Sequence, residues 1–307
     1  MIEAQEITKR FRTLTAVDHV NFTVGAGEVV ALLGPNGAGK TTTVRMLGAI
    51  LAPTAGGARV AGYDIVAEAR NVREHVGMLT EAPGLYDRMT GREYLDFFGE
   101  LRGLTAVERE QHIQQLADRF RLSTALDRRL GGYSKGMAQK ITLMRTLLHD
   151  PAVLLLDEPT SAMDPESARL VRDMILQLRD GKRAIMVCTH NLPEAEELAD
   201  RILIIREGQI VADGTISHLK TELLGSPMME VRFVKPSTDG VSDLISDLAP
   251  VVDSGQTWIR YRTQEPERIN PAVARVLTES GVSLLSLGEV PRSLEAVYLR
   301  VVGEAEA

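Results

Sequence analysis

Short apolar runs alternate with amphipathic stretches through about residue 224 of this 307-residue chain. The apolar runs have the length of buried strands, and the amphipathic stretches repeat apolar positions every three or four residues. This alternation favours an α/β fold with a largely parallel sheet. We predict strands over residues 2–8, 16–24, 28–33, 76–80, 153–156, 183–188, 201–206 and 209–213, and helices over residues 41–51, 92–101, 106–120, 136–148, 165–179 and 193–199.

The pattern changes in two places. Residues 91–148 are helical with little strand between the helices, which predicts a helical subdomain inserted into the sheet. Near residues 224–227 the composition shifts to Gly-Ser-Pro, and we predict one domain over residues 1–224 and a second over 229–307. The second domain has the order β-α-β-β-α-β, typical of a small ferredoxin-like α+β unit, followed by a last helix.

Composition narrows the class of protein. A hydrophobic content of 44% and a charged content of 25% are ordinary for a soluble globular chain. The formal net charge is −7, and the segment 229–307 alone has eight Lys/Arg against twelve Asp/Glu. This acidic balance argues against nucleic acid as a partner. No apolar run approaches the roughly 20 residues that a membrane-spanning helix needs.

The most informative motif lies between the strand ending at residue 33 and the helix that follows. Two glycines with four residues between them precede Lys and Thr, which is the pattern of a phosphate-binding loop. Such a loop points backbone N–H groups at an anion, beside the partial positive charge of a helix N-terminus. The lysine reaches the β- and γ-phosphates, and the threonine hydroxyl ligates Mg²⁺. A Gly-rich turn that matches by chance is disfavoured by the flanking strand and helix. The candidate ATP-binding residues are Gly34, Pro35, Asn36, Gly37, Ala38, Gly39, Lys40, Thr41 and Thr42.

Two acids end the buried strand at residues 153–156. A phosphate-binding loop needs a carboxylate on a neighbouring strand to hold Mg²⁺, and Asp157 has that place. Glu158 is then the candidate general base, which polarises a water for attack on the γ-phosphate. The alternative is a buried strand that ends in two ordinary solvated acids. The loop upstream favours the catalytic interpretation.

A third motif, Tyr133-Ser134-Lys135-Gly136-Met137, stands at the head of a helix, where Ser134 could simply be the N-cap. At this point the chain resembles the ATP-binding subunits of ABC transporters. Their signature, usually Leu-Ser-Gly-Gly-Gln, contacts the γ-phosphate bound by the opposite subunit. Ser134 and Gly136 match it, while Tyr133, Lys135 and Met137 depart from it in a form similar to that of exporters with separate membrane subunits.

The resemblance covers residues 1 to about 224 and assigns further roles. Asp164 matches the acid of the family's D-loop, and His190 matches the switch histidine that orders the attacking water. Phe11 stands where the family stacks an aromatic ring on adenine, although a Phe at the edge of the core is the alternative. Glu81 replaces the usual Gln, so a role in Mg²⁺ ligation is kept and the hydrogen-bond donor is lost.

The resemblance implies a P-loop NTPase core of the ABC type with an antiparallel β subdomain and an inserted helical subdomain. It implies ATP and Mg²⁺ as cofactors and a homodimer that sandwiches two ATP molecules. It further implies integral-membrane permease subunits that dock near residues 81–98 on the cytoplasmic side of the cell membrane, with no nucleic acid. The tail is similar to the extension of drug, sodium and antibiotic-resistance exporters, and we expect a regulatory or dimer-stabilising role or a merely appended domain.

Two other functions remain open from the sequence. A soluble ABC-type ATPase of DNA repair or translation would share these motifs, although such proteins usually have two ATPase units, coiled coils or zinc-binding cysteines. This chain has a single unit and one cysteine. A small-molecule kinase would share only the phosphate-binding loop and would leave residues 133–137 and His190 unexplained. The cargo of a transporter is not readable from this chain.

Overall fold

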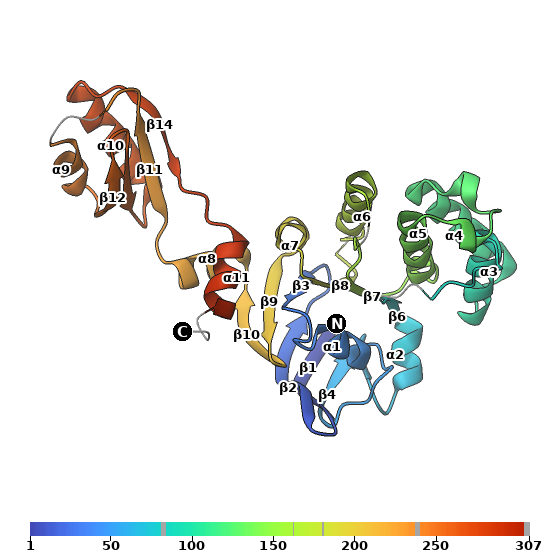
Figure 1. The fold of residues 1–307 in the computed structure, drawn as a ribbon. Coiled ribbons are helices and arrows are strands. Elements are labelled where there is room, and N and C mark those ends of the chain that lie inside the picture. Colours follow the sequence, from blue (N-terminus) through green and yellow to red (C-terminus); the bar gives the residue numbers. More distant parts are fainter. Residues whose placement is uncertain (81–83, 162, 180, 237–239, 304–307) are drawn as a thin grey trace. The chain divides into compact units, whose positions relative to one another are not determined.

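The computed structural model of the protein describes residues 1–80, 84–161, 163–179, 181–236 and 240–303. These form two compact units, Met1–Ile216 and Ser217–Ala307. The first unit contains a six-stranded and a four-stranded sheet, and the second contains a sheet of its own (Figure 1).

The central sheet of the first unit has the strand order β10-β9-β3-β8-β7-β6. Its pairs are parallel except for β10 with β9, as the alternating pattern predicted. Every residue of β3, β7 and β8 is buried because both faces of the sheet are covered. The strands are β3 (Val29–Leu33), β6 (Val76–Leu79), β7 (Val153–Asp157), β8 (Ala184–Thr189), β9 (Arg201–Arg206) and β10 (Gln209–Gly214).

An antiparallel sheet and helix α1 (Lys40–Leu47) share a hydrophobic core with one face of the central sheet. This sheet has the order β2-β1-β4-β5 and confirms the antiparallel subdomain. Strands β4 and β5 and helix α2 were not predicted, and in β4 Gly56 and Gly57 interrupt the alternation of apolar and polar residues. The elements are β1 (Ile2–Phe11), β2 (Leu14–Val24), β4 (Ala55–Val60), β5 (Tyr63–Asp64) and α2 (Ala69–His75).

The predicted helical insertion lies between β6 and β7 and shares the core of the other sheet face (Figure 1). Its helices α3 (Gly91–Leu101) and α4 (Ala106–Phe120) begin with capping boxes formed by Thr90 with Glu93 and by Thr105 with Glu108. Two 3₁₀ turns and α5 complete the insertion, and α6 and α7 follow the strands β7 and β8. Their bounds are η1 (Ser123–Ala125), η2 (Leu130–Gly132), α5 (Lys135–Leu147), α6 (Pro165–Gln177) and α7 (Leu192–Leu198).

The second unit confirms the predicted β-α-β-β-α-β order, with antiparallel strands in the order β12-β13-β11-β14. Its own hydrophobic core includes Val231, Phe233, Tyr261 and Leu277. Helix α8 precedes this order and was not predicted. The elements are α8 (Ile216–Leu224), β11 (Met228–Phe233), α9 (Val241–Ser246), β12 (Val251–Gly255), β13 (Trp258–Arg262), α10 (Pro266–Glu279), β14 (Leu284–Glu289) and α11 (Leu294–Gly303).

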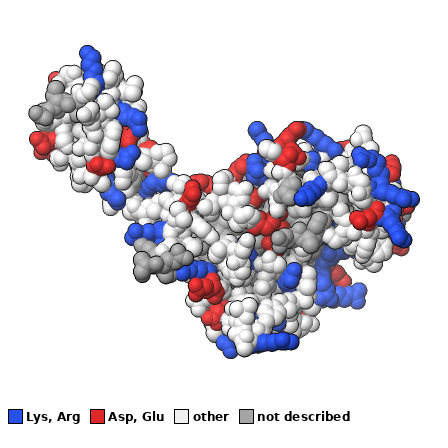
Figure 2. All heavy atoms as spheres, viewed as in Figure 1, with Lys and Arg blue, Asp and Glu red and all other residues white. Residues whose placement is uncertain are grey.

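The distribution of charge on the surface does not indicate a binding site. On the face drawn in Figure 2, Lys and Arg side chains are interspersed with Asp and Glu over the first unit. Within the described part of the chain, no helix combines the length and apolar character that crossing a bilayer requires. A cavity and the buried polar side chains of Lys40 and Asp157 indicate the site instead.

Candidate active site

The loop between β3 and α1 curls as the glycine spacing predicted. Gly37 and Gly39 have φ angles of 82° and 110°, a region that side chains with a Cβ rarely adopt. A Cβ on Gly39 would come within 2.5 Å of the Ala16 carbonyl oxygen. The loop therefore leads directly into the first turn of α1, whose N–H groups and partial positive charge favour an anion.

Lys40 is the first residue of α1 and is 7% exposed. Its ammonium group donates hydrogen bonds to the Gly34 carbonyl at 2.7 Å and to the Pro35 carbonyl at 3.1 Å. The charge is thus held beside the loop, at the position from which a phosphate can take over these hydrogen bonds.

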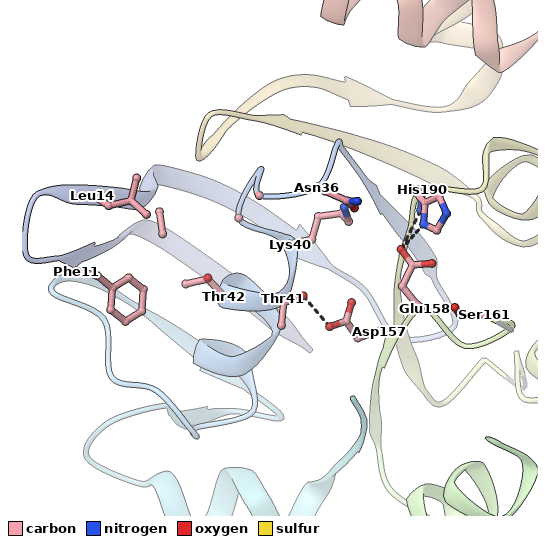
Figure 3. Close-up of a pocket in the computed structure, with 13 residues that line it drawn as sticks. Phe11, Leu14, Asn36, Lys40, Thr41, Thr42, Asp157, Glu158, Ser161 and His190 are labelled. Atoms are coloured by element: carbon pink, nitrogen blue, oxygen red, sulfur yellow. Dashed lines mark hydrogen bonds and ion pairs between the residues drawn. The ribbon is translucent and has the colours of Figure 1, made fainter. Parts of the chain in front are cut away.

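Thr41 and Asp157 meet across the site. The Thr41 hydroxyl donates to the Asp157 carboxylate at 2.9 Å, and Asp157 is 2% exposed at the end of β7 (Figure 3). A hydroxyl and a carboxylate are the hard oxygen ligands that Mg²⁺ prefers, so this pair fits the ion. Among the described residues, no group of three or more His, Cys, Asp or Glu side chains could hold a metal by themselves. Mg²⁺ would therefore need phosphate oxygens or waters as further ligands. The predicted ligand Glu81 lies outside the described residues.

Glu158 and His190 form a pair at the same edge of the sheet. The ring Nδ1 of His190 lies 2.7 Å from Oε1 of Glu158, and the backbone N–H of His190 donates to this oxygen at 3.1 Å. His190 directly follows β8, and Glu158 directly follows β7, so the parallel pairing of the two strands brings the side chains together. The general base and the switch histidine predicted from the sequence are thus in contact.

The backbone at Glu158 is strained. Its φ is +52°, which costs a residue with a Cβ roughly 1–2 kcal/mol. The Glu158 N–H donates to the Cys188 carbonyl at 2.8 Å, and the Gln139 amide donates to the carbonyls of Glu158 and Pro159 at 3.3 and 3.2 Å. These bonds hold the turn after β7 in a conformation that directs the carboxylate along the edge of the sheet.

A cavity of about 500 Å³ connects these groups. Figure 3 shows Phe11 and Leu14 at one end, Lys40 and Thr41 in the middle, and the Glu158–His190 pair at the other end. The Lys9 ammonium lies 5.2 Å from the centroid of the Phe11 ring. Because Phe11 is 44% exposed, its ring can also stack on a base. Along the cavity, the aromatic ring comes first, then the phosphate-binding loop with the Thr41–Asp157 pair, and then Glu158. This order matches the nucleobase, the phosphates and the γ-phosphate end of a nucleoside triphosphate. The lining residues are Phe11, Leu14, Ala16, Asn36, Gly37, Gly39, Lys40, Thr41, Thr42, Asp157, Glu158, Ser161 and His190.

Six predicted ATP-binding residues are not among the described residues that line the cavity. Gly34, Pro35 and Ala38 belong to the loop that leads into α1, whereas the other three lie elsewhere. Ser134, Gly136 and Asp164 do not occur among the described residues that line the cavity. Ser134 accepts from the Met137 N–H at 3.3 Å and Asp164 from the Ser167 N–H at 2.9 Å, so each caps a helix. A Cβ on Gly136 would lie 3.7 Å from the Asp164 carboxylate, so the three residues form a separate group.

Sequence reasoning missed several residues of the cavity. Leu14 and Ala16 belong to β2, next to Phe11, and their positions after the first hairpin could have indicated them. Ser161 lies three residues before Asp164, the predicted acid of the D-loop, and was not assigned a role. Outside the cavity, Glu194 and Thr189 gave no signal in the sequence, because their mutual hydrogen bond forms only once β8 and α7 are assembled.

The fold and the site together define a P-loop ATPase of the ABC type. The model of the family described as "ABC transporter" matches residues 17–161. The ABC transporter ATP-binding protein NatA of Bacillus subtilis is 39% identical over 224 residues, which are 71% of this chain and 91% of that protein. The daunorubicin/doxorubicin resistance ATP-binding protein DrrA of Streptomyces peucetius is 34% identical over 98% of this chain and 92% of its own length. A solved ATP-binding subunit of an ABC transporter has a TM-score of 0.69 and 28% identity, covering 73% of this chain and 94% of its own.

The chain therefore belongs to the ABC transporter family. It is an ATP-binding subunit whose ATPase activity energises transport. The soluble alternative of DNA repair or translation is not favoured by these relatives.

Proposed function

We propose that two copies of this chain close around two ATP molecules and thereby drive separate permease subunits of an exporter. The observation that carries the shared site is the separation of the signature residues from the cavity. Ser134, Gly136 and Asp164 form their own group, while residues of the loop, with Asp157 and Glu158, line the cavity. In a dimer, Ser134, Gly136 and Asp164 of one copy can contact the phosphates that are bound in the cavity of the other copy.

Within each site the residues have distinct tasks. Lys40 neutralises phosphate charge, while Thr41 and Asp157 are placed to hold Mg²⁺, which supplies charge stabilisation when bound. Glu158 polarises the attacking water, and His190 fixes the Glu158 carboxylate. We propose that Glu81 remains a further ligand of Mg²⁺, and that Phe11 stacks on adenine.

An exposed aromatic cluster supports a permease-docking surface. Tyr86 and Phe97 are 51% and 39% exposed, and both pack against Phe98, which lies edge-on to the buried Tyr94. Exposed apolar patches of this kind mark contacts with other proteins. The cluster falls within residues 81–98, where the permease was predicted to dock. We propose that this contact places the subunit on the cytoplasmic side of the cell membrane.

The export direction rests on the relatives. DrrA is named for resistance to daunorubicin and doxorubicin, and its alignment extends through the second unit of this chain. We propose that this chain serves an exporter of the same general kind, with the cargo selected by the permease.

The shared site is tested with two variants at one position. Asp and Asn are both good N-caps, so Ser134→Asp and Ser134→Asn keep the start of α5. Only the aspartate places negative charge where a partner's phosphate would sit. We expect Ser134→Asp to lose ATP hydrolysis while binding a fluorescent ATP analogue normally, and Ser134→Asn to retain a clear part of the activity. Equal activity of Ser134→Asp and the wild type would contradict the proposal.

The docking surface is tested by Phe97→Ser in a complex of this chain with its permease subunits. We expect the basal ATPase activity of the isolated subunit to be unchanged and its stimulation by the permease to be lost. Full stimulation of the variant would show that the permease docks elsewhere. Leu285→Ser, at an exposed apolar position of the second unit, serves as a control.

A further inference from the structure

Glu194 is a buried acid close to the active site that the reaction described above does not use. It is 2% exposed and lies in the first turn of α7. Its two carboxylate oxygens accept separate hydrogen bonds, at 2.6 Å from the Thr160 hydroxyl and at 2.7 Å from the Thr189 hydroxyl. Burial raises the pKa of Glu194, and the nearby negative charge of Glu158 acts in the same direction, while the two hydroxyls and the charge of Arg172 oppose the shift.

The two hydroxyls belong to the segments that carry the reacting groups. Thr160 is two residues after Glu158, in the turn that follows β7. Thr189 is the last residue of β8 and directly precedes His190. One carboxylate therefore ties the segment of the general base to the segment of the switch histidine.

The Thr189 hydroxyl continues this network toward the cavity. It lies 3.5 Å from Oε2 of Glu158 and accepts a hydrogen bond from the Asn191 N–H at 3.0 Å. Its direction is thus fixed on three sides. A shift of Glu194 would move the hydroxyl that stands next to the Glu158 carboxylate.

The start of helix α7 does not depend on the Glu194 carboxylate. Asn191 is the N-cap, and its side-chain oxygen accepts from the Glu194 N–H at 3.2 Å. An apolar side chain could fill the same buried volume without the desolvation that a carboxylate requires. A carboxylate that accepts one hydrogen bond from each threonine instead indicates that Glu194 holds the segments of Thr160 and Thr189 in a fixed arrangement.

We propose that Glu194 is a positioning residue for ATP hydrolysis. Through Thr160 and Thr189 it holds the turn after β7 against the end of β8, so that Glu158 and His190 keep one orientation toward the γ-phosphate. It does not touch the nucleotide site itself, because it is absent from the described residues that line the cavity. Its removal should therefore slow the chemical step and leave ATP binding intact.

The test compares steady-state kinetics of the full chain in four forms. Glu194→Leu removes both acceptors, and Glu194→Gln keeps one acceptor and offers an amide donor to the other hydroxyl. Glu197→Leu removes a carboxylate on the same helix that pairs with Arg172, and it serves as the matched control. We expect Glu194→Leu to lower kcat by about 10- to 100-fold with KM changed less than about threefold, because a small misplacement of catalytic groups acts on kcat. We expect Glu194→Gln to recover most of the activity and the control to resemble the wild type.

Three results would overturn the proposal. They are a kcat of Glu194→Leu within about twofold of the wild type, an equal loss in Glu194→Gln and Glu194→Leu, and a loss in the Glu197→Leu control of the same size. If Glu194→Leu does not fold, Thr160→Val removes one hydrogen bond and keeps the side-chain shape. That variant should also lower kcat at constant KM, and an unchanged kcat would equally overturn the proposal.

Discussion

His190 makes two contacts with a single oxygen of Glu158: its ring Nδ1 lies 2.7 Å from Oε1, and its backbone N–H donates to the same oxygen at 3.1 Å. Oε1 is thereby engaged twice, while Oε2 lies 3.5 Å from the Thr189 hydroxyl. The contact brings two residues that are 32 positions apart in the chain to one point of the site.

Replacement of Glu158 by Gln should nearly abolish hydrolysis and leave ATP binding unchanged. The amide keeps the shape of the side chain but cannot accept a proton, and loss of a general base costs about 10²–10⁴ in rate. Turnover and the affinity for a fluorescent ATP analogue are measured side by side. Glu207→Gln neutralises an exposed acid outside the cavity and should behave as the wild type. Near-normal turnover of Glu158→Gln would remove Glu158 from the role of base.

Replacement of Asp157 by Asn should raise the Mg²⁺ concentration needed for half-maximal ATPase activity by about tenfold or more. The amide can still accept the hydrogen bond from Thr41, so the local structure is kept while a negative charge beside the ion is lost. The measurement is a titration of ATPase activity with Mg²⁺ at saturating ATP. An unchanged Mg²⁺ requirement would place the ion away from Asp157.

Acid should destabilise the fold in part through His149. Burial, and then the charge of Arg102, lower the pKa of His149 from its usual value of 6.5 to about 4. The unfolded chain therefore binds a proton at a pH where the folded chain does not, so the stability is present above about pH 6.5 and is lost as the pH falls toward about 4. The contribution reaches about 3 kcal/mol.

The measurement for His149 is urea unfolding at several pH values between 4 and 7.5. His149→Gln keeps a donor for the Val76 carbonyl and does not titrate, so its free energy of unfolding should fall less steeply below pH 6.5. Identical pH dependence of the two proteins would show that His149 titrates normally in the folded state.

The nucleotide site should survive removal of the second unit. Every described residue that lines the cavity belongs to Met1–Ile216, and the second unit has its own core. We expect the fragments 1–216 and 1–228 to bind ATP with an affinity within about threefold of the full chain, since few contacts usually cross such a boundary. Only the longer fragment contains α8, so a comparison of the thermal stabilities of the two fragments tests whether α8 belongs to the first domain. A folded fragment that does not bind ATP would show that the second unit belongs to the site.

The sequence predicts those parts of the site in which the backbone conformation requires particular residues. Gly37 and Gly39 adopt positive φ, and Lys40 and Thr41 open a helix, so the order of residues specifies the shape. Asp157 and Glu158 were predictable because an apolar strand that ends in two acids leaves them at the sheet edge. Each signal is local in the chain.

The missed parts depend on contacts between distant segments. Glu194 is an ordinary acid at the start of a short helix until β7 and β8 bring Thr160 and Thr189 against it. Strand β4 has no alternation of apolar and polar residues at Gly56 and Gly57, and it is a strand because its backbone pairs with β1.

The central claim is that each ATP site is built from two chains, and complementation between two inactive variants tests it most directly. Lys40→Ala removes the phosphate-binding side of a site, and Ser134→Asp removes the opposite side. Mixed dimers contain one intact composite site, so random pairing should restore ATPase activity to about a quarter of the wild-type level, while each variant alone is inactive. Normal hydrolysis by Ser134→Asp alone, or no recovery on mixing, would contradict the shared site.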